Sequence, residues 1–124
     1  MCTKVLLLDD DERYLDLLKM MLEGCGMEVA ASANGLDLKR LIDLHVPDVI
    51  VMDILMQEYN GVELAKQYRE LPDSRDVPIV FMSAWTGSGE LKLPRNSRRV
   101  FKPFTQSELV ELIKCALDRT KVQA

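Results

Sequence analysis

The sequence has few histidines, few cysteines and no long apolar run, and these shortages exclude several classes of protein. His45 is the only histidine, so sites that need two imidazole ligands, such as the H-E-x-x-H site of zinc enzymes, are excluded. The cysteines Cys2, Cys25 and Cys115 are odd in number and form no C-x-x-C pair. They predict reduced thiols in a cytoplasmic protein rather than a disulfide framework. No apolar run approaches the roughly 18 residues of a membrane span, and we expect neither a membrane segment nor a signal peptide.

An excess of basic residues is also missing. The chain has 16 Lys and Arg against 20 Asp and Glu, a formal net charge of −4. This balance argues against a nucleic-acid-binding surface on the domain. With 124 residues, of which 48% are hydrophobic, residues 1–124 are expected to form one globular domain. A chain of this size buries enough surface to fold without a metal or a disulfide.

Short apolar runs alternate with longer amphipathic stretches along the whole chain. The runs predict five strands, at 5–8, 27–31, 49–52, 78–82 and 99–101. The stretches between them repeat apolar residues every three to four positions, and the last begins with a capping box at Thr105 and Glu108. Gly87, Gly89 and Pro94 fall before the fifth strand, so the fourth of five expected helices should be short or distorted. The pattern predicts an α/β fold with a five-stranded parallel sheet.

Polar residues follow four of the predicted strands: Asp9 and Asp10 the first, Asp53 the third, Ser83 the fourth and Lys102 the fifth. The carboxyl ends of parallel strands share one edge of the sheet, where such folds bind ligands. Each residue alone has an ordinary interpretation, such as a negatively charged helix start or a loop carboxylate. Their occurrence at four strand ends together indicates a functional site.

Three carboxylates at one edge repel each other, by about 4 kcal/mol for a pair 4 Å apart at an effective dielectric near 20. A cation must compensate, and oxygen ligands of this kind suit Mg²⁺. Lys102 would supply a second positive charge and Ser83 a hydroxyl donor. Such a site can accept a phosphoryl group, with Asp53 as the in-line nucleophile.

The sequence resembles the response-regulator receiver domain of two-component signalling, in particular single domains like the chemotaxis regulators. The resemblance covers nearly the whole chain in order and rests on four motifs: Asp9-Asp10-Asp11-Glu12, residues 49–56 with Gly61, residues 78–84, and residues 101–105. It implies a flavodoxin-like, doubly wound sheet of order 2-1-3-4-5. It also implies a cis bond between Lys102 and Pro103.

The resemblance further assigns roles to site residues. Asp53 would be the phosphoacceptor, and Ser83 and Lys102 would hold the phosphoryl oxygens. Mg²⁺ would be bound by Asp9, Asp10, Asp53 and the backbone carbonyl of Leu55. The phosphoryl donor would be a phosphohistidine on a histidine kinase or phosphotransfer protein, and an unidentified protein would be the downstream target. The chain would phosphorylate itself and slowly hydrolyse its phosphoaspartate, and it would turn over no external substrate.

Some positions depart from the family pattern. Gln57 replaces a usual proline, and Arg99 stands where many receivers have an aromatic switch residue, so the output mechanism is open. Ser83 and Lys102 are closer in sequence than usual, which predicts an unusual partner surface. Leu55 and Trp85 are bulky at positions that flank the path of the hydrolytic water, which predicts slow autodephosphorylation.

Three alternatives can be weighed from the residues. A haloacid-dehalogenase-type phosphatase also uses an Asp nucleophile, but the later acidic metal ligands are missing. A flavodoxin is disfavoured because four acids would repel the flavin phosphate. A degenerate receiver that signals by binding alone remains open, as does the question of whether the domain stands alone or is part of a larger protein.

Overall fold

The computed structural model describes residues 2–56, 59–84 and 92–118. The central sheet contains five strands: β1 (Lys4–Leu8), β2 (Glu28–Ser32), β3 (Val49–Asp53), β6 (Ile79–Ser83) and β7 (Ser97–Phe101). All neighbouring pairs are parallel, and the order is β2-β1-β3-β6-β7. In terms of the five sheet strands this is the order 2-1-3-4-5, so the predicted flavodoxin-like fold is confirmed.

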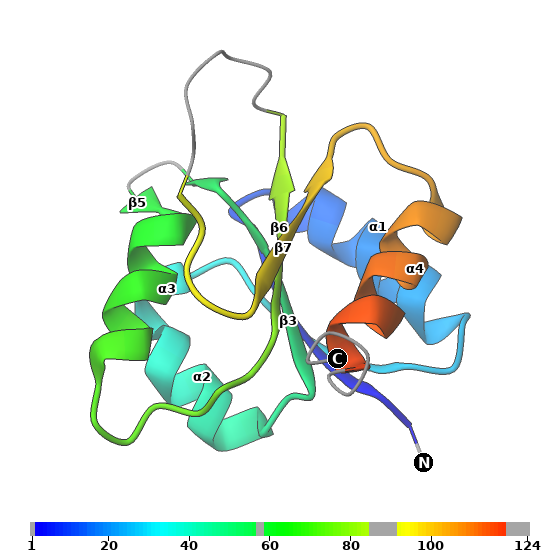
Figure 1. The fold of residues 1–124 in the computed structure, drawn as a ribbon. Helices are drawn as coiled ribbons and strands as arrows, with labels where there is room; N and C mark the ends of the chain where they lie inside the picture. The colour runs from blue at the N-terminus through cyan, green and yellow to red at the C-terminus, as the bar shows by residue number, and fades with distance from the viewer. Residues whose placement is uncertain (1, 57–58, 85–91, 119–124) are drawn as a thin grey trace.

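Four α-helices flank the sheet within the described residues: α1 (Glu12–Glu23), α2 (Leu38–His45), α3 (Gly61–Glu70) and α4 (Gln106–Leu117). Helices α1 and α4 lie on one face and α2 and α3 on the other (Figure 1). Between β6 and β7 the structure describes residues 84 and 92–96, none of which is helical. Residues 85–91, where much of the expected short or distorted helix would fall, lie outside the described part.

Alternating strand residues feed two hydrophobic cores. Leu7, Val51 and Val80 pack with α1 and α4, whereas Leu6 and Ile50 pack with α2 and α3. Every residue of β3 and β6 is buried. A strand covered on both faces needs an unbroken apolar sequence, which explains why these two runs were easy to recognise.

Glycine, proline and a capping box define three of the helix ends. Gly24 keeps a right-handed conformation, and the left-handed glycine that turns the chain toward β2 is Gly26, with φ of 87°. The third helix ends at Glu70, and Leu71 is extended with ψ of 137°, because the following Pro72 disfavours a helical conformation there. The capping box is confirmed, with Thr105 and Glu108 each accepting from the other's backbone N–H at 3.1 Å.

Short elements that the sequence pattern did not reveal lie beside the sheet. A 3₁₀ turn, η1 (Gly35–Asp37), precedes α2, and β4 (Leu55–Met56) pairs antiparallel with β5 (Tyr59–Asn60). The latter two follow β3 directly and lead into α3, so they shape the region next to Asp53.

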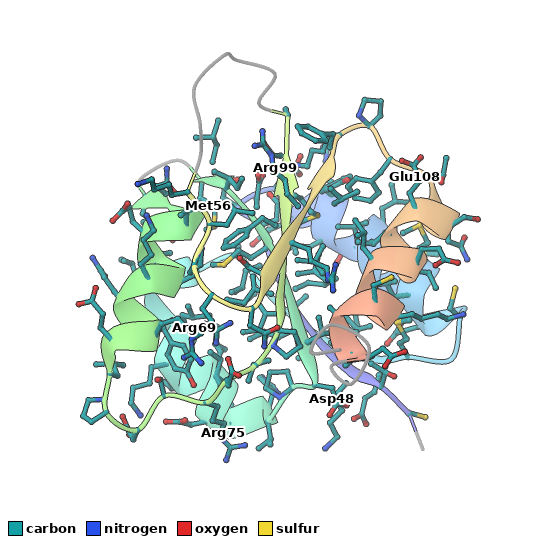
Figure 2. The ribbon with its side chains drawn as sticks, viewed as in Figure 1. Asp48, Met56, Arg69, Arg75, Arg99 and Glu108 are labelled. Atoms are coloured by element: carbon teal, nitrogen blue, oxygen red, sulfur yellow. The ribbon has the colours of Figure 1, made fainter. Side chains whose placement is uncertain are left out.

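Arg69 fastens the loop before β6 to the chain before β7. Its side chain is 8% exposed, and its guanidinium donates to the carbonyl oxygens of Arg75, Val77, Arg95 and Asn96 at 2.6 to 3.4 Å. Figure 2 shows Arg69 between α3 and the adjacent loop. One side chain therefore satisfies four carbonyl oxygens of two otherwise irregular segments.

The longest helices in the described ranges have 12 residues, and none of the helices there is long and apolar enough to cross a membrane.

Candidate functional site

The expected site residues lie at one edge of the sheet. Asp9 directly follows β1 and Lys102 directly follows β7, whereas Asp53 and Ser83 are the last residues of β3 and β6. The parallel register pairs Asp53 with Met82 and Ser83 with Phe101, which brings these strand ends level. Strand order therefore places residues from four distant parts of the sequence together.

Lys102 bridges two of the carboxylates. Its Nζ lies 3.1 Å from Oδ2 of Asp53 and 3.5 Å from Oδ2 of Asp9. One oxygen each from Asp9, Asp10 and Asp53 lie within 4.8 Å of one another. Asp9 is 1% exposed and Asp53 7%, so these charges are largely removed from water. The cluster thus holds more negative than positive charge in a buried position.

Tyr14 on α1 is a neighbour of this cluster that the sequence did not reveal. The ammonium of Lys102 lies 4.5 Å from the centroid of its ring, a cation–π contact. Phe104 contacts the same ring edge to face, with centroids 6.5 Å apart. Lys102 is therefore held on one side by carboxylates and on the other by an aromatic ring. The nearest sequence signal was the position of Tyr14 in the first turn of α1, after the acidic motif.

Burial shifts the protonation equilibria of the cluster. It raises the pKa of Asp9 from 3.8 to about 6, and repulsion from Asp53 adds to this, while the N–H of Asp11 and the charge of Lys102 act in the opposite direction. Burial alone would lower the pKa of Lys102, but the charges of Asp53 and Asp9 outweigh it and raise that pKa. Asp9 is thus a carboxylate short of stabilising partners.

The donor set fits a hard divalent cation. Among the described residues, Oδ2 of Asp9 is buried and has no hydrogen-bond partner, although Lys102 is near. Buried polar atoms are normally satisfied, so this oxygen is available for a cation. Carboxylate oxygens from Asp9, Asp10 and Asp53 are ligands of the type that Mg²⁺ prefers. The backbone N–H of Leu55 donates to Oδ1 of Asp53 at 3.3 Å, and the role expected for the Leu55 carbonyl stays a prediction.

Gly61 has a steric reason to follow Asp53 at its particular spacing. A Cβ at Gly61 would lie 2.2 Å from the backbone oxygen of Asp53, and the N–H of Gly61 donates to the oxygen of Ile54 at 2.7 Å. The start of α3 therefore presses against the end of β3. Only a residue without a side chain permits that approach.

Ser83 is held from two sides. Ser83 is 1% exposed, and its hydroxyl oxygen lies 3.4 Å from Nη2 of Arg99. Its carbonyl accepts from the backbone N–H of Lys102 at 2.8 Å, and the bond between Lys102 and Pro103 is cis, as the resemblance implied. Gln57 and Trp85, which entered the sequence-based expectations, lie outside the described residues.

Comparison with known proteins identifies the family. The family model for the response regulator receiver domain matches residues 5–114. The chain belongs to this family. As a response regulator receiver domain it is a module of two-component signal transduction, which confirms the resemblance seen in the sequence.

The similar proteins cover nearly the whole receiver domain. The polar-differentiation response regulator DivK of Brucella anthropi is 28% identical over 116 residues, which are 91% of this chain and 94% of DivK. A response regulator receiver domain from Francisella is 26% identical with a TM-score of 0.78, covering 95% of this chain and 98% of that one. The receiver domain of a sensor histidine kinase from Pseudomonas aeruginosa PAO1 has a TM-score of 0.82 at 24% identity, covering 94% and 98%. That last structure, which shares the fold, has a magnesium ion in its active-site cleft.

Proposed function

We propose that this receiver domain accepts a phosphoryl group on Asp53 from a phosphohistidine, in a reaction that depends on Mg²⁺, and signals through the resulting change in conformation. The observation that carries the proposal is the placement of the Lys102 ammonium between the buried carboxylates of Asp53 and Asp9, at 3.1 and 3.5 Å. The donor would be a histidine kinase or a histidine phosphotransfer protein. The histidine of this chain, His45 at the end of α2, takes no part in this proposal.

The transfer forms one bond and breaks another. A carboxylate oxygen of Asp53 attacks phosphorus in line with the leaving group, and the P–N bond to the donor's imidazole breaks. The electron pair of that bond returns to the imidazole nitrogen, and with the other ring nitrogen of the donor protonated, the leaving group is neutral imidazole. Lys102 already contacts Oδ2 of Asp53 and is placed to neutralise charge on a transferring oxygen.

Asp9, Asp10 and Asp53 would hold Mg²⁺, with the carbonyl of Leu55 as a further ligand. The ion would supply positive charge to the phosphoryl oxygens. The unsatisfied oxygen of Asp9 and the raised pKa of its carboxyl group support this assignment. Ser83 would donate its hydroxyl proton to a phosphoryl oxygen.

In this proposal the chain turns over no external substrate, and residues 1–124 act as one receiver domain. Hydrolysis of its own phosphoaspartate is expected to be slow, with Leu55 and Trp85 restricting access of water. Leu55, two residues after Asp53, is 57% exposed and so lies at the surface next to the end of β3. The cytoplasmic location that the cysteines predict belongs to the same proposal, as does a protein partner downstream.

Intact mass spectrometry tests the proposal. The protein is incubated with Mg²⁺ and a small phosphodonor such as phosphoramidate, and one added phosphoryl group is expected. Asp53→Asn and a sample without metal should both lack it. Asp48→Asn is the matched control, because Asp48 lies before the same strand at the opposite edge of the sheet (Figure 2) and should leave the added mass unchanged.

An unmodified wild-type protein would contradict the proposal, provided that fast hydrolysis is excluded with beryllofluoride, a stable mimic of the phosphoryl group. In that case the degenerate receiver that signals by binding alone becomes the better interpretation. Modification that survives Asp53→Asn would instead show that another residue is the acceptor.

A further inference from the structure

Arg99 lies on the face of β7 that leads to the candidate site. Side chains alternate along this strand, so Val100 enters the core shared with α4, while Arg99 lies on the opposite face with Phe101. The guanidinium of Arg99 stacks over the ring of Phe101, with its central carbon 4.4 Å from the ring centroid. Figure 2 shows Arg99 beside the upper ends of β6 and β7. The stacking fixes the direction in which the guanidinium points.

The direction of one hydrogen bond follows from chemistry. A guanidinium has only donors, whereas a serine hydroxyl has one donor and two acceptor positions. In the 3.4 Å contact between Nη2 of Arg99 and Oγ of Ser83, the hydroxyl therefore accepts. A hydroxyl that accepts from a cation is polarised and keeps its own proton for donation to another group.

We propose that Arg99 is a positioning residue of the phosphoryl site, which holds the Ser83 hydroxyl as an acceptor and leaves its proton directed to a phosphoryl oxygen on Asp53. The inference rests on the function proposed above. Lys102 is the cation in contact with Asp53, and Arg99 is the cation in contact with Ser83. Two cations thus serve two different groups of one site.

The backbone limits how Ser83 can respond. Its carbonyl is fixed by the N–H of Lys102 at 2.8 Å, and the residue is fully enclosed at the end of β6. With the carbonyl held, Ser83 responds through rotation of its side chain and of its hydroxyl. The contact with Arg99 at 3.4 Å occupies one acceptor position of that hydroxyl and so restricts where its proton points.

The affinity for beryllofluoride in the presence of Mg²⁺ tests this role. Arg99→Gln shortens the side chain and removes the charge, and we expect at least about tenfold weaker binding, the lower end of the effect of losing one hydrogen bond to a charged group. The affinity for Mg²⁺ alone should not change, because Arg99 is not among the proposed metal ligands. Arg98→Gln is the matched control, since Arg98 on the opposite face donates to the backbone oxygen of Cys115 on α4.

A double variant separates action through Ser83 from a direct or purely structural effect. Ser83→Ala alone should weaken beryllofluoride binding, and adding Arg99→Gln to it should cause no further loss. Arg99→Met serves as a second variant, with the same dependence on Ser83, if Arg99→Gln does not fold.

Three results would overturn the inference. The first is an unchanged affinity of Arg99→Gln for beryllofluoride. The second is a loss of beryllofluoride affinity on adding Arg99→Gln to Ser83→Ala that equals the loss in the wild-type background. The third is a loss of Mg²⁺ affinity in Arg99→Gln that parallels the loss of beryllofluoride affinity. If wild-type protein binds Mg²⁺ but neither beryllofluoride nor a phosphoryl group, the proposed function itself fails, and the positioning role fails with it. The wild-type measurement therefore distinguishes the two failures.

Discussion

Replacing Asp9 by asparagine should stabilise the metal-free protein at neutral pH. Asp9 is a buried carboxylate whose pKa is raised from 3.8 to about 6, mainly by burial. Between these values the folded state binds more protons than the unfolded state, so the free energy of unfolding falls as the pH rises through this window. Asparagine has a similar shape but carries no charge, and the variant should not show this loss.

The magnitude follows from the size of the shift. A rise from 3.8 to about 6 corresponds to at most about 3 kcal/mol of lost stability by pH 7, at about 1.4 kcal/mol for each pH unit. Asparagine also removes one of the two carboxylate partners of Lys102 at 3.5 Å, which offsets part of the gain. We therefore expect Asp9→Asn to be more stable than wild type by about 1 to 2 kcal/mol at pH 7.5.

Urea unfolding followed by circular dichroism, from pH 4 to pH 7.5 in the presence of a chelator, measures this difference. The difference in free energy of unfolding between Asp9→Asn and wild type should be near zero at pH 4, grow up to pH 6 and then level off. Mg²⁺ at ten times its Kd should stabilise wild type by about 1.4 kcal/mol and the variant by less. Asp16→Asn, at an exposed position of α1, is the control and should show no such growth. A variant that is less stable than wild type at pH 7.5, or a difference that does not depend on pH, would refute the reasoning.

Three further substitutions test how the chain supports the site. Gly61→Ala should lower the free energy of unfolding in urea by about 2 to 4 kcal/mol, because its Cβ would meet the backbone oxygen of Asp53 at 2.2 Å. Gly26→Asn, at a left-handed position with open space, is the control and should cost less than about 1 kcal/mol. Equal costs for the two variants would contradict the steric argument. Arg69→Met should lower the free energy of unfolding by about 2 to 4 kcal/mol, because four carbonyl oxygens lose a donor from a side chain that is 8% exposed. A loss no larger than that caused by replacing an exposed arginine would refute the role of Arg69 in joining the two segments. Thr105→Ala should cost about 1 kcal/mol through loss of the N-cap hydrogen bond, and a neutral effect would show that the capping box contributes nothing.

The sheet could be predicted from the sequence because its central strands are covered on both faces. Such strands appear as unbroken apolar runs: the expected 49–52 is one residue shorter than β3, and the expected 78–82 is shifted by one residue from β6. The pairing of β4 with β5 could not be predicted in this way. Each has two residues, which is too short for any periodicity to appear.

The candidate site was predictable to the extent that strand ends determine it. Asp53 follows an apolar run and Lys102 follows a weaker strand that ends in Val100 and Phe101, and parallel pairing puts such strand ends together. The contacts of Tyr14 with Lys102 and of Arg99 with Ser83 depend on side-chain directions across different elements. Spacing along the sequence carries no information about those directions, so the structure was needed to find them.

The charge of the site explains why an arginine suits position 99. Three carboxylates and the ammonium of Lys102 leave a net charge of −2, which a divalent cation would neutralise. A phosphoryl group carries about −1.5 to −2 where Asp53 carried −1, so modification makes the site negative again. An aromatic side chain at this position would offer packing but no charge. Arg99, within hydrogen-bonding distance of Ser83, offers one positive charge on the side where that excess would develop, so under the proposed function phosphorylation would act on a charged group rather than on an apolar ring.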